Sequence, residues 1–275
     1  MAKIAAVQLI SSSSVKDNLH QVEHYFLKAK EEAVDLLVLP ENFAFMGKRE
    51  TDKLQCAERF GEGEIQDKIR SLAKRYGVWV IAGTLPVQGA HNKVRASSLV
   101  YDNQGQCVAR YDKIHLFDVR VSAQEAHQES LTVERGTERV VVDTPVGRVG
   151  LSVCYDLRFP ELYHQLASLG AELFAIPSAF TALTGLAHWE VLLRARAIEN
   201  LTYVVAANQG GLHENGRQTY GCSMVVEPWG KIIAQLETGE GMVASEIDLQ
   251  RLHALRQQFP CNAHHVLINE VEKIK

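Results

Sequence analysis

The stretch GLSVCYDLRFPE, residues 150–161, decides how this chain is interpreted. Its first residues are apolar and typical of a buried strand, but the run ends on Cys154, which is followed at once by Tyr155, Asp156 and Arg158. A cysteine that only fills a core has apolar neighbours on both sides. We therefore interpret Cys154 as a residue at the end of a strand, where polar chemistry begins.

Strands and helices alternate outward from this stretch. Apolar residues at helical spacing predict helices, and a last helix has Asp248 as its N-cap. The helices are expected over residues 19–33, 65–76, 160–169 and 189–199, and the strands over residues 3–9, 36–39, 78–82, 96–101, 107–111, 140–143, 149–153, 173–176, 203–207, 223–226 and 232–235. This alternation, with interspersed hairpins, predicts an α/β fold, and the many strands favour two mixed sheets packed face to face under outer helices.

Bulk composition narrows the class of protein. The 275 residues are 46% hydrophobic and show no repeat, linker or low-complexity tract, so we expect one domain over residues 1–275. A net charge of −4 argues against a nucleic-acid partner. No apolar run is long enough to cross a membrane, and the start is unlike a signal peptide. The five cysteines are scattered, with no C-x-x-C pair, which favours a reducing cytoplasm. The eleven histidines include no H-E-x-x-H motif, so we expect no metal site.

Glu41, Lys113 and Cys154 each follow an expected strand. Layered α/β folds gather ligands at the carboxyl ends of their strands, so a carboxylate, an ammonium and a thiol are candidates for one pocket. Taken singly, each has an ordinary structural explanation. Cys154 is explained as a small core residue, Glu41 as a cap or ion-pair partner and Lys113 as a surface lysine. Spacing alone does not show that they meet.

The three residue types suit acyl transfer. A thiol must lose its proton to attack well, and Glu41 is the candidate base. Lys113 would stabilise the thiolate and then the oxyanion of a tetrahedral intermediate, with the backbone N–H of Tyr155 as the second oxyanion donor. Glu41 would next protonate the departing amine and later activate water to hydrolyse the thioester.

Three motifs give these residues a context: LLVLPENF at residues 36–43, YDKIHLFD at residues 111–118 and GLSVCYDLRFPELY at residues 150–163. In this order they resemble the nitrilase superfamily of carbon–nitrogen hydrolases, and the resemblance extends over residues 3–248.

The resemblance implies a Glu-Lys-Cys triad at Glu41, Lys113 and Cys154, with no metal or organic cofactor. It implies a four-layer αββα sandwich that pairs across its helices into a homodimer or a higher homo-oligomer. A second, supporting glutamate of the family best matches Glu129, in the segment HQESLTVERG. The alternative for Glu129 is an exposed loop glutamate.

Residues 184–200 and 219–230 are most similar to the branch of the superfamily that cleaves deaminated glutathione to 2-oxoglutarate and cysteinylglycine. The sister branch, omega-amidase, removes ammonia from 2-oxoglutaramate. The resemblance thus implies a small-molecule amide with a 2-oxo acid acyl group. The size of the leaving group decides between the two branches, because ammonia needs almost no room and cysteinylglycine needs an open cleft.

A 2-oxo acid requires a fixed cation or oriented donors in the pocket. Arg158 is the first candidate, and its alternative is an internal pair with Asp156 or Glu161. Phe45 is a candidate for the wall of the acyl pocket or for plain packing. Thr181 and His188 follow a strand that ends at the same edge, and His188 alternatively caps the helix that starts near residue 189.

Arg194 and Arg196 are two apart on the same expected helix, so they face different sides and at most one points inward. Two rival functions remain open at this point. One is a catalytically silent interaction scaffold, because a fold does not settle function. The other keeps the enzyme but changes the reaction to nitrile hydrolysis or N-carbamoyl cleavage.

Overall fold

The computed structural model describes residues 1–123 and 125–266. Along the chain the elements are β1 (Ala2–Gln8), α1 (Val15–Glu31), β2 (Leu36–Val38), α2 (Glu64–Tyr76), β3 (Trp79–Gln88), β4 (Val94–Tyr101), β5 (Cys107–Asp112), β6 (Asp118–Arg120), β7 (Ala126–Gln128), β8 (Val141–Thr144), β9 (Gly147–Leu151), α3 (Pro160–Ser168), β10 (Leu173–Ala175), α4 (Ala182–Asn200), β11 (Tyr203–Ala206), β12 (Gly210–Leu212), β13 (Gln218–Tyr220), β14 (Ser223–Val226), β15 (Ile232–Leu236), β16 (Gly241–Ile247) and α5 (Leu249–Gln258).

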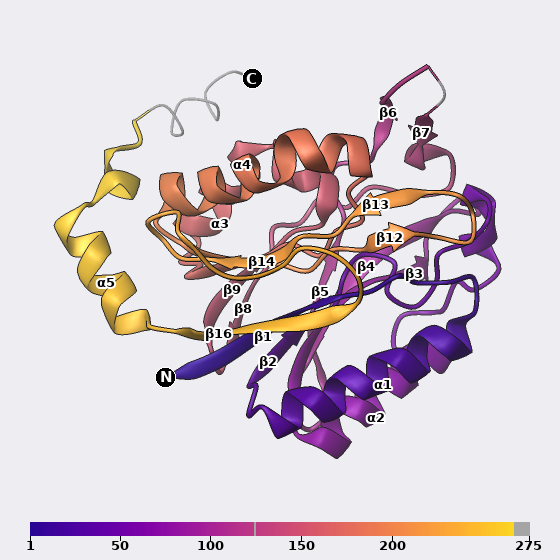
Figure 1. Cartoon of the computed structure of the whole chain (residues 1–275), viewed down its shortest axis with the longest axis horizontal. Coiled ribbons are helices and arrows are strands. Elements are labelled where there is room, and N and C mark those ends of the chain that lie inside the picture. The colour runs from indigo at the N-terminus through magenta and orange to yellow at the C-terminus, as the bar shows by residue number, and fades with distance from the viewer. Residues whose placement is uncertain (124, 267–275) are drawn as a thin grey trace.

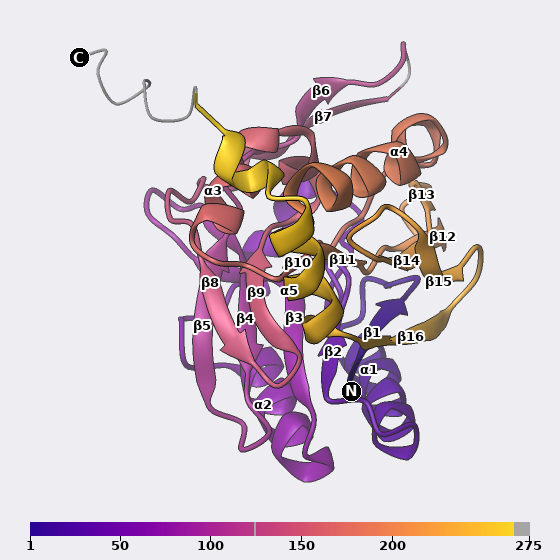
Figure 2. The ribbon, with the colours of Figure 1, turned by 90° about the vertical axis from the view of Figure 1, so that its left-hand side faces the viewer.

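Two six-stranded mixed sheets form the centre of the molecule. Their strand orders are β16-β1-β2-β3-β4-β5 and β15-β14-β11-β10-β9-β8. In each sheet three consecutive strands are parallel, namely β1-β2-β3 and β9-β10-β11, and antiparallel strands flank them. Helices α1 and α2 cover one outer face and α3 and α4 the opposite one (Figure 1, Figure 2). The four-layer αββα sandwich predicted from the sequence is therefore confirmed.

The alternation of side chains along the strands builds two cores. In β1, Ile4 and Ala6 face the space between the two sheets, whereas Ala5 and Val7 face α1 and α2. Successive side chains on a strand point to opposite faces, so a strand that is buried on both faces is apolar throughout. This explains why β1 and β2 are continuous apolar runs in the sequence.

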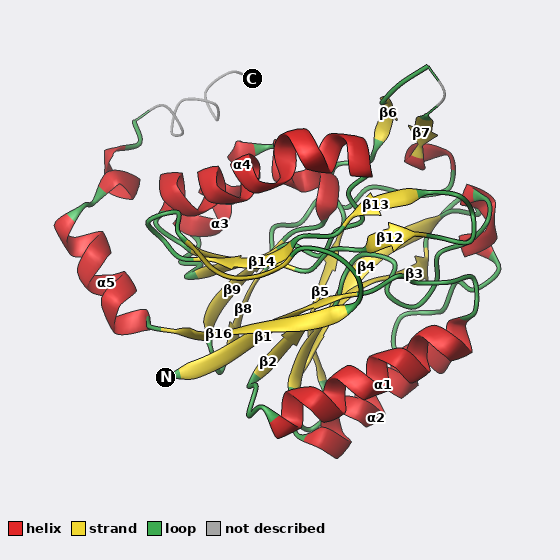
Figure 3. Ribbon diagram, in the orientation of Figure 1, coloured by secondary structure: helices red, strands yellow, loops and turns green. Residues whose placement is uncertain are grey.

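Most expected elements are present, but three differences matter. Helix α4 begins at Ala182 and not near residue 189, because the Thr181 side chain accepts a hydrogen bond from the Thr184 N–H and caps the helix there. His188 therefore lies within α4 and does not cap it. The structure also contains two short hairpins, β6–β7 and β12–β13, that were not expected from the sequence. Figure 3 shows β13 beside α4.

Within the part of the chain that the structure describes, no helix has the length and apolar character needed to cross a membrane.

Candidate active site

Glu41 stands just beyond the carboxyl end of β2, on a backbone that is held from two sides. The Gln209 side chain donates to the Glu41 carbonyl over 3.0 Å, and the Asn42 N–H donates to Thr84 Oγ1 over 2.9 Å. Gly83 packs so closely that a Cβ there would lie 1.8 Å from the Pro40 carbonyl oxygen. The position of Glu41 therefore depends on a glycine in the neighbouring strand β3.

Lys113 follows β5, and its ammonium is fully engaged by carboxylates. Nζ donates to Glu41 Oε1 over 2.7 Å and to Glu129 Oε2 over 2.9 Å, and the side chain is 2% exposed. Burial alone would lower the pKa of Lys113, but the charges of Glu129 and Glu41 outweigh it and hold that pKa well above its usual value. The lysine is therefore a permanent cation between two anions.

Glu129 lies against Lys113 and not in open solvent. Its Oε2 also accepts the Phe117 N–H over 2.7 Å, and the side chain is 12% exposed. Burial raises the pKa of Glu129, but the Lys113 charge and these two hydrogen bonds outweigh that effect and lower it overall. Of the two interpretations that the sequence left open, the exposed loop glutamate is excluded by this burial.

Cys154 occupies a sharp turn between β9 and the 3-10 turn Cys154–Arg158. Its φ is +48°, in the left-handed region that non-glycine residues seldom adopt, and its N–H donates to the Pro177 carbonyl over 2.9 Å. Burial raises the pKa of the Cys154 thiol, the Glu41 charge raises it further, and Lys113 offsets part of the rise. The resting thiol is therefore protonated and needs a base.

Asp156 joins the two segments that carry Lys113 and Cys154. Its carboxylate is completely buried and accepts four hydrogen bonds. Oδ2 accepts from Tyr111 Oη over 2.7 Å and from the Val153 N–H over 2.8 Å. Oδ1 accepts from the N–H and from Nδ1 of His115, over 3.0 and 2.7 Å. Asp156 thus holds the two segments together through hydrogen bonds, and it does not pair with Arg158.

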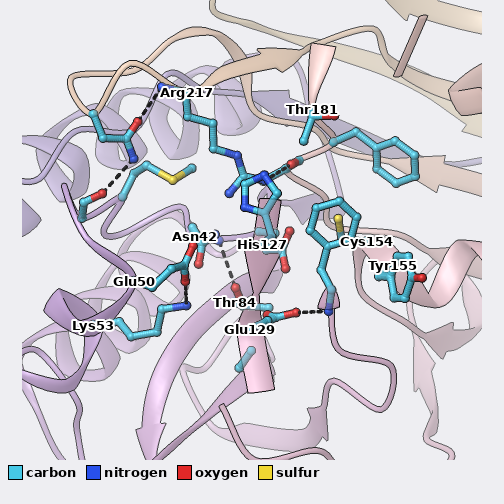
Figure 4. A pocket seen from close by; sticks show the side chains of 18 of the residues that line it. Asn42, Glu50, Lys53, Thr84, His127, Glu129, Cys154, Tyr155, Thr181 and Arg217 are labelled. Carbon is cyan, nitrogen blue, oxygen red and sulfur yellow. Dashed lines mark hydrogen bonds and ion pairs between the residues drawn. The ribbon is translucent and has the colours of Figure 1, made fainter. Parts of the chain in front are cut away.

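A cavity of about 620 Å³ opens over the Cys154 thiol. Figure 4 shows Cys154, Glu129, Thr181 and Arg217 around the same space. Six cationic and four anionic side chains line it: Lys48, Arg49, Lys53, Lys113, Arg158 and Arg217, with Glu41, Glu50, Glu125 and Glu129. The excess of cations contrasts with the negative net charge of the whole chain and suits an anionic ligand.

The structure brings most of the sequence-predicted residues to this cavity. Phe45, Tyr155, Arg158 and Thr181 line it together with the three strand-end residues. His188 is not part of its lining, and its Nδ1 lies 3.2 Å from Arg158 Nη1.

Neither arginine in the middle of α4 reaches the cavity. Arg194 donates to the Gly230 carbonyl and pairs with Glu190. Arg196 is buried against the Leu157 carbonyl. Both are therefore structural residues.

Four cationic residues of the cavity were not predicted from the sequence, namely Lys48, Arg49, Lys53 and Arg217. Lys53 lies in the 3-10 turn Glu50–Leu54 and pairs with Glu50 over 2.8 Å. Arg217 lies in the turn that connects β12 and β13, directly before β13. The Asn215-Gly216 pair is a turn signal that would have predicted this hairpin, but not the side of the molecule that it covers.

Among the described residues, no group of three or more His, Cys, Asp or Glu side chains is arranged to hold a metal ion.

Comparison with known proteins identifies the family of the chain. The profile of the carbon–nitrogen hydrolase family matches residues 3–257. A deaminated glutathione amidase of Yersinia enterocolitica is 41% identical over 98% of this chain and 95% of its own length. The human deaminated glutathione amidase is 39% identical over 95% of this chain and 81% of its own length.

A solved structure shares the fold. The crystal structure of Saccharomyces cerevisiae Nit3, a member of branch 10 of the nitrilase superfamily, superimposes with a TM-score of 0.85 at 31% identity, over 94% of both chains. The chain therefore belongs to the carbon–nitrogen hydrolase family, within the nitrilase superfamily. It is a hydrolase of carbon–nitrogen bonds other than peptide bonds, and among its relatives it is similar to the deaminated glutathione amidases.

Proposed function

We propose that the protein hydrolyses deaminated glutathione to 2-oxoglutarate and cysteinylglycine, with Cys154 as the nucleophile, Glu41 as the proton carrier and Lys113 as the electrostatic stabiliser. The observation that carries the proposal is the contact of 2.7 Å between Lys113 Nζ and Glu41, beside a buried cysteine at the floor of a cationic cavity. The two amidase relatives supply the substrate.

The first half of the reaction forms a thioester. Glu41 takes the proton of the Cys154 thiol as sulfur attacks the amide carbon. The negative charge that develops on the amide oxygen is stabilised by the Lys113 ammonium and by the Tyr155 N–H, which has no partner among residues 1–123 and 125–266. The carbon–nitrogen bond then breaks, and Glu41 returns the proton to the departing amine.

The second half of the reaction releases the acid. Water replaces the amine, Glu41 takes one of its protons, and the resulting hydroxide attacks the thioester carbon. The carbon–sulfur bond breaks and the proton returns to Cys154. Glu129 takes no part in proton transfer, because its role is to hold the Lys113 ammonium in position over 2.9 Å. We assign it as a positioning residue.

The remaining sequence-predicted residues are assigned to substrate binding. Phe45 and Thr181 line the cavity, and we assign Phe45 to the acyl group and Thr181 to the leaving group. Arg158 lies over the Tyr155 and Phe180 rings, at 5.8 and 5.4 Å from their centroids, and offers a cation at the cavity wall. His188 forms a hydrogen bond with the Arg158 guanidinium and orients it.

The experiment compares kcat/KM for deaminated glutathione and 2-oxoglutaramate, with Cys154→Ala as the matched control. The proposal expects turnover of both, a higher kcat/KM for deaminated glutathione, and loss of both in a folded Cys154→Ala protein. Preference for 2-oxoglutaramate would make the protein an omega-amidase with the same mechanism. Full activity of Cys154→Ala would remove the cysteine from the reaction, and an unreactive wild type would favour the interaction scaffold.

We also propose that the protein forms a homodimer across its outer helices and works in the cytoplasm. Large apolar side chains are exposed on α4, with Leu186 76% and Val191 67% exposed. Light scattering after size exclusion should give a dimer, and Val191→Glu should shift it towards monomer. A wild-type monomer would contradict the pairing. All five cysteines are free thiols, which fits a reducing compartment.

A further inference from the structure

Arg217 differs from the other cations of the cavity in how its donors are used. Its Nη2 donates to the Ala179 carbonyl over 2.6 Å, while its Nε–H is buried and has no hydrogen-bond partner within the described residues. Its guanidinium forms no ion pair there, whereas the neighbouring Glu50 is already paired with Lys53. A buried guanidinium donor without an acceptor is costly unless a ligand supplies one.

The hairpin that carries Arg217 is fastened on both sides. The Arg217 N–H donates to Asn215 Oδ1 over 2.9 Å, and the Asn215 amide donates to the Gly47 carbonyl over 2.8 Å. The Arg217 carbonyl accepts the His213 N–H over 2.9 Å. Arg217 is therefore held by its backbone and by one guanidinium nitrogen in the absence of a ligand. Such preorganisation favours binding of a carboxylate.

The hydrogen bond to Ala179 also fixes the position of the Arg217 side chain relative to Cys154. Burial raises the pKa of the Cys154 thiol, and a hydrogen bond from the Ala179 backbone acts in the opposite direction. Arg217 is thus bonded to the same residue whose backbone contacts the Cys154 thiol. By contrast, the Arg49 side chain at the mouth of the cavity is 77% exposed.

We propose that Arg217 binds the carboxylate at the acyl end of the substrate and thereby selects monoamides of dicarboxylic acids. This inference rests on the proposed function and goes beyond it, because it assigns the residue that recognises the acyl group. The acyl carboxylate is separated from the reacting carbonyl by a few carbon–carbon bonds, which suits a cation beside the nucleophile. The second carboxylate of deaminated glutathione, on the leaving group, points to the mouth of the cavity, where Lys48 and Arg49 lie.

The kinetic test uses Arg217→Gln and Arg217→Lys, with Arg75→Gln as a matched control on the far, exposed face of α2. Arg217→Gln should lower kcat/KM by about 100-fold for both 2-oxoglutaramate and deaminated glutathione. Turnover of pentanamide, which has no carboxylate, should change by less than about twofold. Arg217→Lys should recover part of the loss, because it keeps the charge without the planar fork.

Two kinetic results would overturn the inference. A loss confined to deaminated glutathione would place Arg217 at the leaving group, and an equal loss for pentanamide would make it a structural residue.

A binding measurement separates this inference from the proposed function. Titration of 2-oxoglutarate into the Cys154→Ala protein should show binding that Arg217→Gln in the same background weakens by about 100-fold, whether or not the wild type turns over deaminated glutathione. Equal affinity of the two proteins for 2-oxoglutarate would refute the role of Arg217 even if the amidase activity is found.

Discussion

Replacing Asp156 by asparagine tests how the site is assembled, because this buried carboxylate is not part of the cavity lining and yet connects the segments that carry Lys113 and Cys154. Tyr111 and His115 lie two residues on either side of Lys113, and Val153 precedes Cys154. All three donate to Asp156. The substitution preserves shape but removes one acceptor oxygen and the negative charge, so it weakens the hydrogen bonds that Asp156 accepts.

The expected magnitude follows from the four hydrogen bonds. Asparagine keeps one oxygen, so its amide group must face either the Tyr111 and Val153 donors or the two donors of His115. A tyrosine hydroxyl can rotate and an imidazole can change tautomer, but a backbone N–H cannot become an acceptor. One backbone N–H therefore always loses a charged acceptor, which costs about 2–3 kcal/mol of unfolding free energy.

Activity should fall together with stability. If the Lys113 segment shifts by a fraction of an ångström relative to Cys154, kcat should drop by about 10- to 100-fold, while KM changes little because the cavity wall is untouched. Urea unfolding followed by tryptophan fluorescence measures the first effect, and steady-state kinetics measures the second.

Tyr111→Phe is the matched control, since it removes one hydrogen bond and should cost about 1 kcal/mol. In the double mutant the two losses should not add, because the residues are in contact. A loss of less than about 0.5 kcal/mol for Asp156→Asn, or an unchanged kcat in a destabilised protein, would refute this account of the site.

Two further predictions concern the residues around the triad. Gly83→Ala should lower the unfolding free energy by about 2 kcal/mol or more and reduce kcat, because the new Cβ would lie 1.8 Å from the Pro40 carbonyl oxygen and displace Glu41. Thermal unfolding and steady-state kinetics measure the two effects, and wild-type values of both would contradict the prediction. The folded-state pKa of Glu129 is lowered, so its ion pair with Lys113 stabilises the fold fully above about pH 5 and is lost as the pH falls through that lowered pKa. The stability gap between wild type and Glu129→Gln should therefore be constant from pH 8 to about 5 and shrink below about pH 4, and a gap independent of pH would argue against it.

The strands and the positions of Glu41 and Cys154 at strand ends followed from the sequence for a local reason. Apolar runs that end on a polar residue predict both the strand and its carboxyl end, and parallel strands bring those ends together. Glu41 after β2 and Cys154 after β9 were found in this way. The number of strands favoured two sheets packed face to face, but that Glu41, Lys113 and Cys154 share one cavity is a tertiary property, and only the resemblance to the family implied it.

The residues that were wrongly interpreted lie in turns, where the local sequence does not indicate the direction in which a side chain points. Asp156 was considered only as an ion-pair partner of Arg158, because the short turn that carries both gives no periodicity from which to infer their directions. In the structure Asp156 points into the core and Arg158 towards His188. Arg217 was not predicted because it lies 63 residues after Cys154 in the sequence. The residues around it give no indication that its hairpin packs beside the cavity.

The left-handed backbone at Cys154 connects these observations. A φ of +48° at a cysteine costs about 1–3 kcal/mol, and such strain persists only where surrounding contacts over-determine it. Here the N–H of Cys154 is fixed by Pro177, and the turn after it is fixed by Asp156 through Val153. The same turn leaves the next N–H, that of Tyr155, without an acceptor in the described chain. The strain thus accompanies a turn that places the Cys154 thiol beside the N–H of the next residue, and Asp156 helps to hold that turn.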